Sequence, residues 1–144
     1  MKYLSIIALS LILFSCNGKV KTNQSKATSQ KEANKIEVID FHSTHRCMTC
    51  KAIEANTKYT LKTYFANEIS NGKITFQLVN VDDEKNYKMA EQFEATGTAL
   101  FLNVIINGVE KHIDLTDFAF MKGMEKEAFA EELKSKLEAE LKNI

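Results

Sequence analysis

The chain has 144 residues, a length that favours a single domain. Hydrophobic residues make up 44% of it and charged residues 26%, which is typical of a soluble globular domain. The 19 basic and 19 acidic residues give a net charge of zero, which excludes the strongly basic surface of a nucleic-acid-binding protein, so we expect no nucleic-acid partner.

Residues 1–16 have the pattern of a lipoprotein signal peptide. Lys2 is followed by a nearly unbroken apolar run that ends directly at Cys16. The run is short for a transmembrane span and suits a secretory h-region. Leu13-Phe14-Ser15-Cys16 resembles a lipobox, in which signal peptidase II cleaves before a lipid-modified cysteine, although Phe14 is bulkier than usual. We predict lipidation at Cys16. An ordinary signal peptide with a chance cysteine, or an uncleaved anchor, is the alternative.

Residues 17–35 form a polar segment with no aromatic residue and one branched aliphatic residue, Val20. Such a segment cannot bury a core, so we predict a disordered tether. As a flexible coil it would hold the following domain on the order of 25 Å from the membrane. The predicted location is therefore extracytoplasmic: the domain is lipid-anchored to the bacterial cell envelope, either facing the periplasm or on the outer membrane.

Residues 35–41 are predicted to form a strand that is buried on both faces, because Ile36, Val38, Ile39 and Phe41 leave little polar surface. Asp40 lies near its end, in apolar company. It either caps the following turn or is a buried acid with a raised pKa that exchanges protons with nearby groups.

The segment Cys47-Met48-Thr49-Cys50 follows, at the point where a helical pattern begins. A helix N-terminus stabilises a thiolate, so the pKa of the Cys47 thiol should be depressed. Arg46, the only arginine of the chain, would help, as would His45 when protonated. Cys50 lies one helical turn further on, within reach of a disulfide with Cys47. The pattern favours a dithiol–disulfide redox site.

Two alternatives remain for this segment. His42, His45, Cys47 and Cys50 form an H-x2-H-x-C-x2-C pattern whose ligands suit Cu(I) or zinc. The absence of a second CxxC argues against a four-cysteine zinc site. The cysteines could instead form a purely structural disulfide in a non-catalytic interaction domain. We favour the redox interpretation, in which the protein has no metal.

The remaining elements follow from periodicity and turn signals. We predict a helix over 48–70, a buried strand over 73–81, a short helix from 82 to about 94, strands over 99–106 and 109–115, a loop over 117–123 and a final helix over 124–141. Asn107-Gly108 indicates a hairpin between the last two strands. The order β-α-β-α-β-β-α predicts an α/β fold with a mixed sheet flanked by helices.

That order, with CxxC after the first strand, resembles the thioredoxin-like superfamily over residues 36–144. Three stretches carry the resemblance: VIDFHSTHRCMTCK, ITFQLVNVDDEKN and TGTALFLNVIINGVE. The resemblance implies that Cys47 is the exposed attacking thiol, Cys50 the resolving thiol and Asp40 the buried proton acceptor. The chain has no proline, so Thr98 or Ala99 occupies the position of the family's cis-proline, and a trans bond is expected there. Leu78 replaces a lysine expected near the aspartate.

More narrowly, FHSTHRCMTCKAIE resembles a bacteroidal family of secreted thioredoxin-like proteins named nitrophenyl compound nitroreductase subunit ArsF. The chain has no glycine-rich phosphate loop for a flavin or a nicotinamide, so we expect no cofactor and no nitro reduction by this chain alone. The predicted activity is that of a thiol–disulfide oxidoreductase. Its predicted partners are protein dithiols or disulfides and a membrane electron donor or acceptor.

Overall fold

The computed structural model describes residues 33–144. The predicted signal peptide, the predicted lipidation site Cys16 and most of the predicted tether lie outside the described residues. The elements, in order, are β1 (Lys35–His42), α1 (Met48–Tyr64), α2 (Ala66–Ser70), β2 (Ile74–Asn80), the 3₁₀ turn η1 (Glu84–Asn86), α3 (Tyr87–Gln92), β3 (Ala99–Ile106), β4 (Val109–Asp114), α4 (Thr116–Lys122) and α5 (Lys126–Leu141). No helix within 33–144 is long and apolar enough to cross a membrane.

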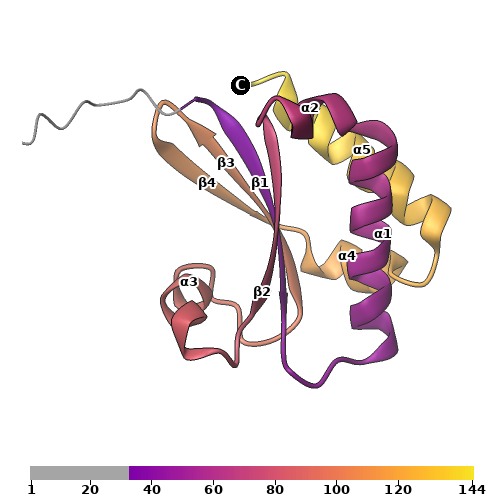
Figure 1. The fold of residues 1–144 in the computed structure, drawn as a ribbon. Helices are drawn as coiled ribbons and strands as arrows, with labels where there is room; N and C mark the ends of the chain where they lie inside the picture. Colours follow the sequence, from indigo (N-terminus) through magenta and orange to yellow (C-terminus); the bar gives the residue numbers. More distant parts are fainter. Residues whose placement is uncertain (1–32) are drawn as a thin grey trace, which may run out of the picture.

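The four strands form one mixed sheet in the order β2-β1-β3-β4 (Figure 1). β1 runs parallel to β2 and antiparallel to β3, and β4 returns antiparallel to β3. Helices α1, α4 and α5 lie together on one side of the sheet, and α3 lies on the other (Figure 1). The predicted α/β class, with a mixed sheet flanked by helices, is confirmed.

β1 lies at the centre of the molecule because its side chains alternate between two cores. Ile36 and Val38 join the larger core under α1, α4 and α5, whereas Ile39 and Phe41 join the smaller core near α3. All four are fully buried, and each such side chain contributes about 1.5–3 kcal/mol of hydrophobic stabilisation. The prediction of a strand buried on both faces is confirmed.

The hairpin between β3 and β4 turns at Asn107-Gly108, as the sequence predicts. Both residues have positive φ, +54° for Asn107 and +80° for Gly108. A two-residue hairpin loop requires this conformation at both positions, and asparagine followed by glycine adopts it with little strain. β3 begins and ends at the predicted residues, and β4 ends one residue earlier than predicted.

Three predicted elements were wrong in detail. The helix expected over 48–70 ends at Tyr64 and restarts as α2, because Phe65 leaves helical geometry (φ −127°) while its side chain is buried. The strand expected to be buried, β2, is an edge strand, and Leu78 is 40% exposed. The helix expected from 82 to about 94 consists of η1 and the short α3.

The loop expected over 117–123 is the helix α4. Leu115, Phe118 and Ala119 follow each other at helical spacing and are all buried, and Phe118 packs on Phe129 of α5 with ring centroids 4.9 Å apart. Burial of this short apolar face stabilises the helix. The segment is too short for its periodicity to stand out from the sequence.

Candidate functional site

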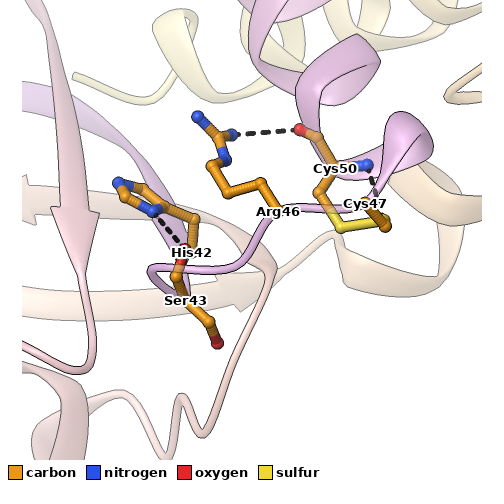
Figure 2. Close-up of a disulfide and its surroundings, with 5 residues drawn as sticks. All are labelled: His42, Ser43, Arg46, Cys47 and Cys50. Carbon is orange, nitrogen blue, oxygen red and sulfur yellow. Dashed lines mark hydrogen bonds between the residues drawn. A yellow bond between two sulfur atoms is a disulfide. The ribbon is translucent and has the colours of Figure 1, made fainter.

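Cys47 and Cys50 are joined by a disulfide at the N-terminus of α1 (Figure 2). Cys47 is exposed and is the N-cap residue, and its Sγ accepts a hydrogen bond of 3.1 Å from the backbone N–H of Cys50. Cys50 is only 7% exposed, and the two Cα atoms are 5.1 Å apart. One sulfur therefore faces solvent at the positive end of a helix, and the other is shielded by the fold.

The loop that leads into the cysteines is fixed to the end of β2. The backbone N–H of Thr44 donates to the carboxylate of Asp82 at 2.6 Å, and the side-chain amide of Asn80 donates to the Thr44 hydroxyl at 3.2 Å. The hydrogen bond from Thr44 lowers the pKa of Asp82. Both side chains belong to the stretch ITFQLVNVDDEKN, which carries part of the resemblance, and the structure shows that they hold the loop before the cysteines.

The two histidines of the alternative metal site do not gather around the cysteines. His42 bonds through Nδ1 with the backbone carbonyl of Ser43 at 2.9 Å, and its ring lies apart from the disulfide (Figure 2). His45 lines a shallow pocket over Cys47 together with Thr44, Arg46 and Lys51. Within residues 33–144, no three histidine, cysteine or acidic side chains are grouped to hold a metal ion. The metal interpretation stays an alternative prediction.

Asp40 is fully buried below α1, and neither carboxylate oxygen has a hydrogen-bond partner among the described residues. Its neighbours on the adjacent strands, Leu78 of β2 and Leu100 of β3, are apolar. Burial raises the pKa of Asp40 to about 7, against the lowering effects of Arg46 and Lys58. Of the two sequence interpretations, the structure supports the buried acid, because a capping carboxylate would accept backbone hydrogen bonds.

Arg46 does not point its charge at the Cys47 sulfur. Its guanidinium forms an ion pair with Glu54 and donates a hydrogen bond of 3.1 Å to the backbone carbonyl of Cys50 (Figure 2). Glu54 also pairs with Lys58, one turn further along α1. Burial would raise the pKa of Glu54, but hydrogen bonds from Lys58 and Arg46 outweigh it and lower that pKa. Stabilisation of the thiolate by Arg46 and His45 stays a prediction.

The segment before β3 lies beside the loop that precedes Cys47. A Cβ placed on Gly97 would lie 3.7 Å from the Ser43 hydroxyl oxygen, which puts residues 96–98 next to the loop that precedes Cys47. Every peptide bond within the described part of the chain is trans, as predicted for the positions of Thr98 and Ala99. A proline-free backbone therefore lies beside the loop that precedes Cys47.

The chain matches no protein-family model and no curated protein. Among solved structures, it is similar to a malarial protein with 20% identity and a TM-score of 0.40, over 62% of this chain and 96% of that one. It is also similar to a thioredoxin from Thermus thermophilus, with 16% identity and a TM-score of 0.38, over 55% of this chain and 58% of that one. Because both TM-scores are below 0.5, the fold class rests on the strand order and directions alone.

Proposed function

We propose that this protein is a membrane-tethered, extracytoplasmic thiol–disulfide oxidoreductase. One observation carries the proposal: an exposed sulfur, Cys47, caps a helix and is paired with a shielded sulfur, Cys50, and a buried acid, Asp40, lies below the same helix. A thiolate at that helix end is stabilised, a resolving thiol is within bonding distance, and a proton acceptor lies inside the fold.

In the reductive direction, the Cys47 thiolate attacks one sulfur of a substrate disulfide. A mixed disulfide forms, and the first substrate sulfur leaves as a thiolate. Cys50 then loses its proton to Asp40 and attacks the Cys47 sulfur. The second substrate sulfur leaves, and the Cys47–Cys50 disulfide closes. Two electrons pass from the protein to the substrate, whose two thiolates take up protons, one of them returned by Asp40. The oxidative direction is the reverse.

Membrane tethering is part of the proposal because of two features of the sequence. An apolar leader that ends at Cys16 and a polar segment before residue 36 would place the domain outside the cytoplasm on a lipid anchor. Protein dithiols or disulfides would be its substrates there. A membrane electron donor or acceptor would return the Cys47–Cys50 pair to its starting state. A low pKa of the Cys47 thiol would make the protein more oxidising, because it favours the reduced form.

The test is a redox titration of the Cys47–Cys50 pair in a defined thiol–disulfide buffer, with free thiols counted by alkylation and mass. We expect a reversible midpoint well above about −300 mV, the region of inert structural bridges. A disulfide that stays closed throughout would refute the proposal and favour a non-catalytic interaction domain with a structural disulfide. Reduced thiols that resist alkylation until a chelator is added would refute it in favour of a metal site. A Cys16→Ser variant removes the third thiol as a control.

A further inference from the structure

Three charged side chains, on α1 and in the loop before it, act electrostatically on the buried carboxyl group of Asp40. Glu54 binds Arg46 through one carboxylate oxygen and Lys58 through the other. The side chains of Arg46 and Glu54 are only 14% and 18% exposed, so water screens this ion pair weakly. The Nε of Arg46 is buried and has no hydrogen-bond partner among the described residues. Arg46, Glu54 and Lys58 are called the α1 charge triad below.

The α1 charge triad acts on both groups of the proposed proton transfer, Cys50 and Asp40. Through Arg46 it holds the backbone carbonyl of Cys50, with an N···O distance of 3.1 Å. The cations Arg46 and Lys58 lower the pKa of Asp40, and the anion Glu54 raises it. The facing positions of β2 and β3 hold the apolar Leu78 and Leu100, so no charge comes to Asp40 from these two positions.

We propose that Glu54 is a positioning residue of the redox site, which holds Arg46 and Lys58 in place and partly neutralises them, so that Asp40 can both accept and donate the Cys50 proton. The inference rests on the proposed function. A group that transfers protons in both directions works best when its two protonation states are close in free energy at the working pH. Without Glu54, the two cations would favour the ionised form of Asp40 more strongly. Without the cations, Glu54 would add to burial in favouring the neutral form.

The first test follows the Asp40 carboxyl carbon by NMR across a pH titration of the oxidised full chain. Glu54→Gln removes an anion and releases two cations, so the Asp40 titration should move to lower pH by roughly one unit, the low end of the effect of a neighbouring charge. Lys58→Met removes a cation and should move it to higher pH. The double variant should fall between the two single variants.

The opposite directions separate electrostatics from structure, because a loosened fold would move the titration the same way in both variants. Glu138→Gln removes an acid from an exposed i,i+4 pair on α5 and serves as the matched control, with no expected shift. Glu54→Asp keeps the charge and should stay closer to the wild type than Glu54→Gln. Shifts in the same direction, or no shift in either variant, would overturn the proposal.

The second test measures how the rate of disulfide reduction by dithiothreitol depends on pH. The inflection that follows Asp40 should move down in Glu54→Gln and up in Lys58→Met, in step with the NMR shifts. NMR shifts without these rate changes would overturn the role of Glu54 in proton transfer. Failure of the proposed function would look different: the wild-type pair would stay closed in the redox titration while the opposite NMR shifts persisted. That result would overturn both proposals.

Discussion

Replacing Asp40 by asparagine should make the protein more stable at neutral and alkaline pH. Asp40 is fully buried without a hydrogen-bond partner among the described residues, and its pKa is raised from 3.8 to about 7. Between these two values the folded protein keeps a proton that the unfolded chain has lost. The free energy of unfolding therefore falls as pH rises from about 4 to about 7 and is level above that range.

The size of this change in the free energy of unfolding follows from the shift in the pKa of Asp40. About three pKa units at 1.36 kcal/mol each give roughly 4 kcal/mol as the full cost of ionising Asp40 in the folded state. At about pH 4.5 roughly 1 kcal/mol of this cost is already present, so about 3 kcal/mol develops between pH 4.5 and pH 8. An unpartnered amide in Asp40→Asn costs about 1–3 kcal/mol at both pH values and cancels from the comparison.

The assay is denaturant unfolding of the oxidised wild type and Asp40→Asn at both pH values, with the free energies extrapolated to water. The difference between variant and wild type should grow in favour of the variant by about 3 kcal/mol from pH 4.5 to pH 8. Asp117→Asn, at an exposed position in the first turn of α4, is the control and should show no comparable growth. A difference that is the same at both pH values would refute a buried, proton-holding Asp40.

Three further predictions concern the surroundings of the disulfide. Gly123→Ala should lower stability by about 1–3 kcal/mol in thermal unfolding, because the new Cβ would lie 2.7 Å from a backbone carbonyl of α4, whereas Gly97→Ala should have little effect. Equal effects would contradict this reasoning. Asp82→Ala should speed hydrogen exchange of the Thr44 backbone amide, which donates a hydrogen bond to the Asp82 carboxylate. Unchanged exchange would show that other contacts hold this loop. Mixed with a substrate disulfide, Cys50→Ser should accumulate mixed disulfides on non-reducing gels and Cys47→Ser should not, so equal trapping would contradict the assigned roles.

The fold was predictable from sequence wherever burial or turn chemistry leaves a strong local pattern. β3 was located to the residue because eight successive residues are nearly all apolar and are followed by Asn107-Gly108. The failures lie where tertiary contacts outweigh local pattern. The buried Phe65 interrupts a helix that the sequence continues, and the seven residues of α4 fold because the core covers one face. The edge position of β2 depends on strand order, which periodicity does not report.

The geometry of the cysteine pair was predictable from the sequence, and the electrostatics around it were less so. The spacing of Cys47 and Cys50 and the start of a helix at the same place indicate a capped thiol pair, and the structure has that geometry. The partner of Arg46 was missed because Glu54 is eight residues away in the sequence. The i,i+4 spacing of Glu54 and Lys58 was the available signal. Its link to Asp40 depends on how α1 lies across β1, which only the structure shows.

The cations that act on Asp40 should move with α1 and not with the sheet. A lysine on β2 would be fixed to the sheet, like Asp40 itself, but β2 carries Leu78 there and the cations come from Arg46 and α1. They are therefore coupled to the helix that carries the cysteines. Gly123 packs against the first turns of this helix, where a Cβ would lie 3.0 Å from a methyl carbon of Thr49. Displacing these turns should then alter the charge around Asp40, so we expect Gly123→Ala to shift the Asp40 titration as well as lower stability.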